Sequence, residues 1–368
     1  MALLFAFIAY ITSNAIANLA LLGKTFSFDF LDTPAHYDIN QSLIEYSSKS
    51  THFRAGVVGI LNTLLVAFWG IILATILGFI FGVLRLSPNW LVSRMVYCFI
   101  EFTRNVPVLL HILLIHGFVV HLLPRPKEAQ EWANLAETVF FTNRGVFAPQ
   151  PLPQDGFSWV VTAIVVAIAG SIVFRRWAKA QQDATGRHLP VFWICLAAII
   201  VVPLLVYLLA GAPLVWNYPA LKGFNFKGGF VIRPEFLALT LALALYTSAF
   251  IAEIVRAGIL AIDKGQWEAS LAVGMSRART LNLVIIPQAM RVIVPPLTSQ
   301  YLNLTKNSSL AIAIGYMDIV ATVGGITLMQ TGKEMETMII VIGFYLSVSL
   351  TISMIMNWYN KRIKLVER

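Results

Sequence analysis

Charged side chains are scarce in this chain. Asp, Glu, Lys and Arg make up 12% of the 368 residues, whereas 58% of the residues are hydrophobic. A soluble domain carries about a quarter charged residues, because its surface faces water. The shortage of charge therefore excludes an ordinary soluble domain and favours a protein that folds in a lipid bilayer.

The chain also has few cysteines and lacks a standard nucleotide-binding motif. Cys98 and Cys195 are the two cysteines, and both lie in apolar runs, where we interpret them as core or lipid-facing residues. The sequence contains no G-x-x-x-x-G-K-[ST] phosphate-binding loop. No Ser/His/Asp or Cys/His arrangement stands out, so we expect a chain without catalytic residues.

Three histidines share one apolar run without forming a metal site. His111, His116 and His121 recur every five residues, so successive rings on a helix would point ~140° apart. They cannot converge on one ion or haem from a single face, and we expect no metal on this chain.

The apolar residues form continuous runs of about 20, the length that spans a bilayer as a helix. A lipid-facing barrel would alternate apolar and polar residues instead. The predicted fold is all-α, a polytopic membrane helical bundle with eight candidate spans at 2–22, 56–82, 95–122, 158–174, 191–210, 236–256, 281–303 and 336–358. No basic residue precedes the first run, which favours a span over a cleaved signal peptide, the alternative.

The positive charges are distributed unequally between the two sets of loops. Loops 83–94, 175–190 and 256–282 and the tail 359–368 hold 14 Lys and Arg in 65 residues, against 11 in 123 residues for the opposite loops. Positive charge concentrates on the cytoplasmic side of membrane proteins, so this set and both termini are predicted to be cytoplasmic. The net charge of +9 is thereby explained without nucleic acid.

The chain divides unevenly along its length. We expect an N-terminal span and periplasmic loop at 1–55, a first core part at 56–122, a second core part at 236–358 and a cytoplasmic tail at 359–368. Between the core parts lies an insert, 123–235, with two spans and Pro- and Gly-rich segments that favour ordered loops over helix.

One cytoplasmic loop, residues 264–287, has a recognisable spacing. It reads Glu268-Ala269-Ser270, three residues, Gly274, nine residues, then Val284-Ile285-Ile286-Pro287. This resembles the EAA loop, E-A-A-x3-G-x9-I-x-L-P, of permease subunits of bacterial ABC importers, with Ser at the third position and Val and Ile in place of Ile and Leu. The resemblance implies a coupling helix at about 264–276 that contacts an ATPase through Gly265, Glu268, Ala269, Ser270 and Gly274.

Further segments resemble the polar-amino-acid branch of that family, and they cover about 56–122 and 236–358. The extra first span and the insert resemble the larger permease subunits of general L-amino-acid and glutamate/glutamine/aspartate/asparagine importers. The matching segments are Asn62-Thr63-Leu64, Glu101–Pro107 with Asn105 where many members have Gly, Thr247–Ile259, Gly265-Gln266, Pro287–Ala289, Pro295–Leu297 and Leu304–Leu310 with Ser308 at a Thr position.

The resemblance implies the partners and the mechanism. A type I importer has a periplasmic amino-acid-binding protein, a dimer of cytoplasmic ATPase subunits that hold ATP and Mg, and a second permease, similar to this chain or identical to it. This chain would carry no cofactor and would couple ATPase closure to alternating access in the bacterial inner membrane. The sequence does not specify which amino acid is carried.

Polar residues inside the spans need a partner or a wet cavity. Glu101 with Arg104 and Glu253 with Arg256 are three residues apart on one helical face, which favours structural ion pairs. A break at Pro295-Pro296 would free backbone groups beside the polar residues that follow it. The predicted substrate path comprises Arg104, Asn105, Glu253, Gln300, Asn303, Lys306 and Asn307.

Two other classes of protein remain as alternatives. An ion-coupled secondary amino acid carrier would not need the EAA spacing, and no internal repeat of the kind many such carriers have is evident. A membrane anchor of a redox complex would need paired histidines on facing spans, and a second histidine-bearing span is missing.

Overall fold

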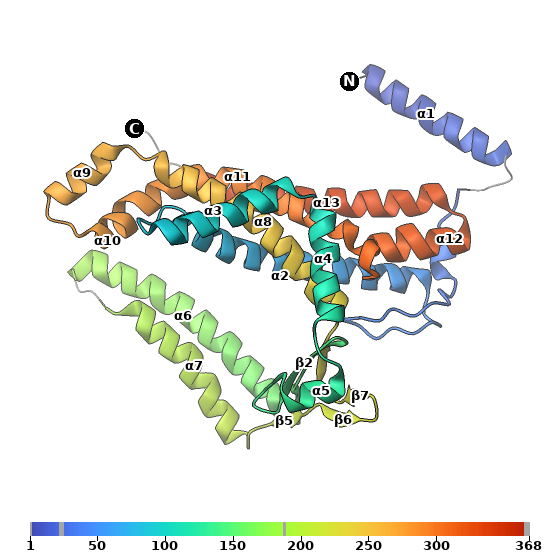
Figure 1. Ribbon diagram of the computed structural model, residues 1–368, viewed down its shortest axis with the longest axis horizontal. Coiled ribbons are helices and arrows are strands. Elements are labelled where there is room, and N and C mark those ends of the chain that lie inside the picture. Colours follow the sequence, from blue (N-terminus) through green and yellow to red (C-terminus); the bar gives the residue numbers. More distant parts are fainter. Residues whose placement is uncertain (1, 22–25, 187–188, 364–368) are drawn as a thin grey trace. The chain divides into compact units, whose positions relative to one another are not determined.

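The computed structural model describes residues 2–21, 26–186 and 189–363 (Figure 1). Within them the chain forms two compact units, which divide after Leu122 and after Ile232. Unit 1 holds the segments before Leu122 and after Ile232, and unit 2 holds the segment between them. Parts of the predicted span 2–22, of the 1–55 segment, of the 175–190 loop and of the 359–368 tail lie outside the described residues.

Unit 1 is helical. Its longer helices are α1 (Ala2–Leu21), α2 (His52–Leu84), α3 (Trp90–Asn105), α4 (Val108–His121), α8 (Pro234–Leu260), α9 (Lys264–Ala272), α11 (Ile286–Asn307) and α13 (Glu334–Ile363). Shorter helical segments join them, namely η1 (Asp29–Asp32), α10 (Arg277–Thr280), η2 (Leu281–Ile285), η3 (Ser308–Ile314), η4 (Val320–Thr327) and α12 (Leu328–Thr331).

The core of unit 1 lies where α2 packs on α8. A Cβ atom at Gly82 would lie 2.7 Å from the Cβ of Val255, and a Cβ at Gly78 would overlap the side chain of Ile251. The helices can approach this closely because these two positions of α2 carry no side chain. Helix α8 is accordingly buried along most of its length.

Among the described residues, six helices are long and apolar enough to cross a membrane, and α3 with α4 form a further, bent pair. The predicted span at 95–122 is not one straight helix, because α3 and α4 meet at 112°. Pro107 lacks an N–H and forces the preceding residue into an extended conformation. Val106 has φ −105° and ψ 133°, which ends α3 at Asn105.

Helix α11 is continuous where a break was expected. It runs without interruption from Ile286 to Asn307 with Pro295 and Pro296 inside it, so the predicted break is wrong. Membrane helices tolerate internal proline where neighbouring groups satisfy the freed carbonyls. At its start, Pro287 lies in the first turn, where a missing N–H costs little.

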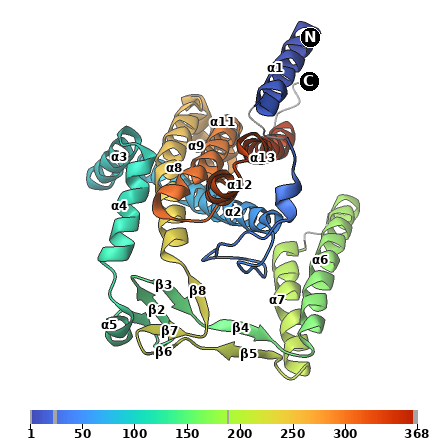
Figure 2. The same ribbon diagram turned by 90° about the vertical axis from the view of Figure 1, so that its right-hand side faces the viewer.

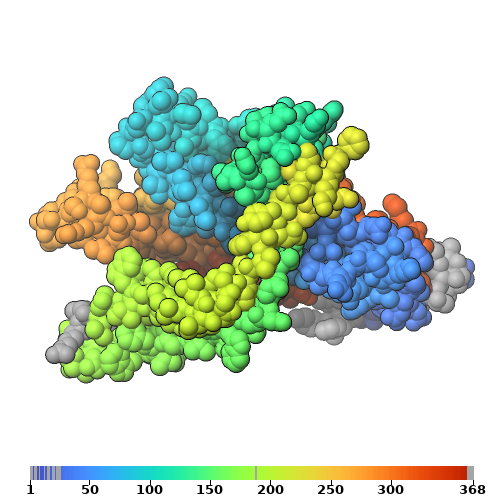
Figure 3. All heavy atoms as spheres, turned by 90° about the horizontal axis from the view of Figure 1, so that it is seen from below, coloured from blue at the N-terminus to red at the C-terminus, as the bar shows by residue number. Residues whose placement is uncertain are grey.

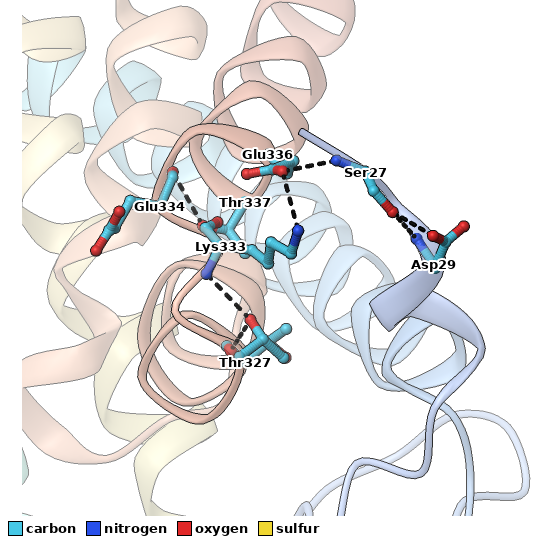
Figure 4. Close-up of polar contacts among 8 residues, drawn as sticks. Ser27, Asp29, Thr327, Lys333, Glu334, Glu336 and Thr337 are labelled. Atoms are coloured by element: carbon cyan, nitrogen blue, oxygen red, sulfur yellow. Dashed lines mark hydrogen bonds and ion pairs between the residues drawn. The ribbon is translucent and has the colours of Figure 1, made fainter. Parts of the chain in front are cut away.

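Residues 26–51 pack against η4 and the start of α13. The Ser27 amide donates to Oε1 of Glu336 at 2.9 Å, and Nζ of Lys333 lies 3.7 Å from the same oxygen (Figure 4). Nδ1 of His52, which is 3% exposed, lies 2.9 Å from Oγ1 of Thr327. These contacts join Ser27 and the first residue of α2 to η4 and the start of α13.

Unit 2 combines a helical hairpin with short antiparallel strands (Figure 2). Its helices are α5 (Pro126–Glu131), α6 (Phe157–Thr185) and α7 (Val191–Leu209). The strands are β1 (Asn134–Leu135), β2 (Val139–Thr142), β3 (Gly145–Ala148), β4 (Gln150–Pro153), β5 (Leu214–Asn217), β6 (Ala220–Lys222), β7 (Asn225–Lys227) and β8 (Phe230–Ile232).

The strands form a four-stranded sheet in the order β1-β2-β3-β8 and two ribbons, β4-β5 and β6-β7. The β4–β5 ribbon leads into α6 and out of α7, so it lies at the end of the helical hairpin away from the α6–α7 turn. Phe140, Phe147 and Phe226 form a small core between the sheet and the β6–β7 ribbon. The Pro- and Gly-rich composition of this region predicted ordered loops and not strands.

Candidate functional site

The loop between α8 and α11 begins with a capped helix, α9, at one end of unit 1 (Figure 1). The side chain of Asp263 accepts a hydrogen bond from the Gly265 amide at 2.6 Å, as an N-terminal capping aspartate does. A Cβ at residue 265 would lie 3.0 Å from the same carboxylate oxygen. Gly265 therefore permits the close approach that starts the helix.

The predicted coupling residues point in two directions. Ser270 is 6% exposed, and its Oγ donates to the Gln266 carbonyl at 2.6 Å. Glu268 and Ala269 are exposed. Gln288 on α11 donates from Nε2 to Oε1 of Gln266 at 3.2 Å and links α9 to the following helix. Ser270 thus bonds within α9 itself, whereas Glu268 and Ala269 lie on its exposed surface.

Gly274 ends α9 with a left-handed turn. Its φ is +83°, its amide donates to the Leu271 carbonyl at 2.9 Å, and the Met275 amide donates to the Ser270 carbonyl at 3.1 Å. This pair of bonds is the Schellman motif, which favours glycine at that position. The helix therefore covers 264–272 of the predicted 264–276, and the remainder is the turn into α10.

The turn folds α10 back toward α9 and leaves a cleft between them. The cleft has a volume of about 490 Å³ and is lined by Trp267, Leu271, Arg277, Ala278 and Leu281. Trp267 and Leu271 are four residues apart and so share one flank of α9. An apolar cleft with a cationic rim is a shape that can receive a side chain or a helix end from another protein.

The ion pairs in α8 and α3 differ in closeness. Arg256 donates to Oε1 of Glu253 through both Nε, at 2.9 Å, and Nη2, and the two side chains are 32% and 30% exposed. Arg104 and Glu101 lie 4.0 Å apart and are more exposed. The guanidinium of Arg104 also lies 5.7 Å from the centre of the Phe250 ring, three residues before Glu253.

The predicted path residues lie on different helices, Asn105 at the end of α3 and Lys306 near the end of α11. Nδ2 of Asn105 donates to the Glu101 carbonyl at 2.7 Å, at the bend between α3 and α4. Lys306 and Asn303 are exposed on α11, and Gln300 and Asn307 are half-buried there.

The predicted path residues on α8 and on α11 lie at different levels along helix α2, as their neighbours' contacts with α2 show. Leu304 on α11 packs against Gly70, whereas the residues that flank Glu253 on α8, Ile251 and Val255, pack against Gly78 and Gly82. The two levels are about ten residues of α2 apart, or ~15 Å along the helix axis. The structure therefore separates Arg104, Asn105 and Glu253 from the set on α11 that contains Gln300, Asn303, Lys306 and Asn307.

A buried polar cluster around Asp318 was not recognised in the sequence analysis. Asp318 is 0% exposed and accepts from the Ala321 amide at 2.8 Å and from the Tyr345 hydroxyl at 3.4 Å. It lies between the last two candidate spans, and burial raises its pKa to about 7. The available signal was that Asp318 is the single charged residue in 307–332.

Within the part of the chain that the structure describes, no three His, Cys, Asp or Glu side chains are grouped so that they could hold a metal ion.

Comparison with known proteins places the chain in a family. The family model described as "Binding-protein-dependent transport system inner membrane component" matches residues 184–365. The chain is 47% identical to the general L-amino acid transport system permease protein AapQ of Rhizobium johnstonii, over 100% of this chain and 90% of that protein. It is 47% identical to the glutamate/glutamine/aspartate/asparagine transport system permease protein BztB of Rhodobacter capsulatus, over 100% of this chain and 92% of that protein.

A shorter protein also matches. The probable glutamine ABC transporter permease protein GlnM of Bacillus subtilis is 32% identical over 211 residues, which are 57% of this chain and 93% of that protein. Full-length similarity to AapQ and BztB, together with the apolar helices, shows that this chain belongs to the inner-membrane permease subunits of amino acid ABC transporters.

Proposed function

We propose that this chain is the membrane-spanning subunit of an ATP-driven, binding-protein-dependent importer of polar L-amino acids. Its role is to convert closure of a separate ATPase dimer into alternating access of the spans. The observation that carries the proposal is α9, a capped helix with exposed Glu268 and Ala269 that ends at the left-handed Gly274 beside an apolar cleft.

The coupling residues have separate tasks in this proposal. Gly265 and Ser270 stabilise α9 itself through the local contacts with Asp263 and Gln266. Glu268 and Ala269 face the ATPase. Gly274 provides the turn, and the Gln266–Gln288 hydrogen bond carries displacement of α9 into α11.

The polar path works in two stages, because its residues lie at two levels ~15 Å apart along α2. The amino acid first meets Gln300, Asn303, Lys306 and Asn307, where the Lys306 ammonium attracts its carboxylate. It then passes Arg104, Asn105 and Glu253, which offer charges of both signs to a zwitterion.

The partners follow from the mechanism. ATP and Mg are held by the ATPase dimer, the chain itself carries no cofactor, and a second, similar permease completes the path. A periplasmic amino-acid-binding protein delivers the substrate. Both termini and the loop with α9 face the cytoplasm of a bacterial inner membrane, because the loops on that side hold the denser positive charge.

The test is to purify the complex that assembles on this chain and reconstitute it in liposomes with binding protein and a panel of amino acids. We expect ATP hydrolysis and uptake that a few polar amino acids stimulate together. Uptake that follows an ion gradient, with no ATPase in the complex, would replace this proposal by the secondary carrier.

A further inference from the structure

The β6–β7 hairpin of unit 2 places a large aromatic side chain at its apex. The strands pair as far as Lys222 with Asn225, which leaves Gly223 and Phe224 as a two-residue turn. Gly223 has φ +69°, which suits glycine at the first position of such a turn. The Phe224 side chain is 91% exposed. Figure 3 shows the yellow segment that contains this turn projecting from its surroundings.

Phe224 is exposed although other apolar residues of the same hairpin are packed in a core. On the same hairpin Phe226 is 4% exposed and stacks on Phe140 with ring centres 4.2 Å apart, and Leu221 packs against that cluster. Residues of a strand alternate between faces, so Lys222 and Lys227 lie together on the opposite, outward face. The hairpin is thus anchored by its own apolar residues and still presents an additional phenylalanine.

A third cation holds the apex in place. Nη1 of Arg144, from the β2–β3 turn, donates to the Phe224 carbonyl at 3.1 Å. The apex backbone is therefore fixed before any partner arrives, which lowers the entropic cost of binding. The hairpin itself, 220–227, contains no Asp or Glu. We refer to Phe224 with Lys222, Lys227 and Arg144 as the basic knob.

We infer that the basic knob is the contact through which unit 2 receives the soluble amino-acid-binding protein, on an acidic surface with an apolar pocket. The inference rests on the proposed function, which supplies the partner. A few residues near the centre of a contact commonly carry most of its binding energy, and Phe and Arg are among the residues enriched there. The surrounding cations steer an acidic partner and make its association sensitive to salt.

A lipid surface is the less favoured occupant. Unit 2 already contains α6 and α7, both of which pass as candidate membrane spans, so it has no need of a further anchor. Aromatic anchors at membrane interfaces are mainly Trp and Tyr, whose polar groups reach the headgroups. A phenylalanine on a fixed turn is better matched to a concave protein pocket.

The test uses the complete complex in nanodiscs with purified binding protein. We expect Phe224→Ser to weaken binding, measured by interferometry, about tenfold or more, and the Lys222→Glu/Lys227→Glu double variant to do so most strongly at low salt. Binding-protein-stimulated ATPase should fall in parallel. The control is Trp216→Ser on β5, an aromatic residue of the same unit that is 47% exposed, and it should stay within about twofold of wild type.

Three results would overturn the inference that the basic knob contacts the binding protein, while the proposed function stands. The first is wild-type binding in both variants, or an equal loss in Trp216→Ser. The second is failure of the variants to assemble with the second permease on size-exclusion chromatography, which would make the knob a subunit contact. The third is hydrogen-exchange protection of 220–227 by anionic nanodiscs without binding protein. A wild-type complex that the binding protein does not stimulate would instead overturn the proposed function and the knob together.

Discussion

Nδ2 of Asn62 lies 2.9 Å from the carbonyl oxygen of Met317, a contact between residues that are 255 positions apart. The Tyr316 hydroxyl returns a hydrogen bond to the Asn62 carbonyl at 3.1 Å, and the Ile319 amide donates to Oγ1 of Thr63 at 3.2 Å. These contacts tie α2 to the connection between η3 and η4.

Replacing Asn62 by Ala should destabilise the protein by about 1–3 kcal/mol, because the buried carbonyls of Met317 and Gln41 would lose their donor. Thermal unfolding of the purified protein in one detergent measures the effect. Asn303→Ala is the matched control, since Asn303 is exposed on α11. Equal midpoints for the two variants would mean that the Asn62 contacts contribute nothing to stability.

Asp318 should make stability depend on pH. Burial raises its pKa in the folded protein to about 7, above the value of about 4 in an unfolded chain. Between these values the folded state holds the proton while the unfolded state has lost it, so stability falls as pH rises from about 4 to 7 and levels off above.

Asp318→Asn should remove most of that dependence, because an amide keeps the acceptor for the Ala321 amide and cannot ionise. The measurement is the unfolding midpoint of wild type and variant from pH 5 to pH 8. Parallel curves would show that Asp318 does not titrate in this range.

The two ion pairs of the spans should differ in coupling energy. Glu253 and Arg256 share two hydrogen bonds and are about a third exposed, whereas Glu101 and Arg104 lie 4.0 Å apart and are more exposed. Solvent screening lowers the coupling energy of both pairs. A double-mutant cycle to alanine should give about 1 kcal/mol for the first pair and a few tenths for the second. A larger value for the Glu101 pair would contradict this ranking.

Much of the fold of unit 1 could be predicted from apolar run length, because a bilayer demands about 20 residues for each helical span. The bend at Pro107 could also have been read from the sequence, since proline both lacks an N–H and restricts Val106. The continuity of α11 through Pro295 and Pro296 could not, because it depends on what packs around the freed carbonyls.

The candidate site also has some features that could be predicted from the sequence and others that could not. The turn at Gly274 follows from local chemistry, and its left-handed φ of +83° is what a glycine after a short helix indicates. The hydrogen bonds of Asn62 and Thr63 with residues 316–319 join segments about 255 residues apart, and no local pattern reveals such a pairing. The strands of unit 2 have two to four residues each, too few for an alternation to be recognised.

Gly274→Asp should abolish transport and leave membrane insertion intact. A Cβ at Gly274 would meet nothing within 4 Å in this chain, so the cost within the chain is that of a left-handed residue, about 1–2 kcal/mol. Gly186→Asp is the control, because Gly186 is equally left-handed at φ +72° and equally open. Loss of transport in the first variant alone would identify the obstruction as a contact with another protein. Normal uptake by Gly274→Asp would remove the argument for α9 as the coupling helix.

The hydrogen bond between Gln266 and Gln288 links the proposed coupling helix, α9, to α11. At 3.2 Å it joins α9 to α11 across 22 residues of chain, and it is exposed, so its loss should cost little stability. Gln266→Ala and Gln288→Ala should each lower the amino acid transported per ATP by about two- to threefold, which corresponds to a bond worth roughly 0.5 kcal/mol.

The double variant should match either single variant, because the two changes remove one interaction. Transport and ATP hydrolysis are measured on the same liposomes, so that a weaker ATPase contact, which lowers both, is distinguished from a looser link, which lowers their ratio. Effects that multiply in the double variant would mean that the glutamines act separately, and that displacement of α9 reaches α11 through the chain of α10 and η2 instead.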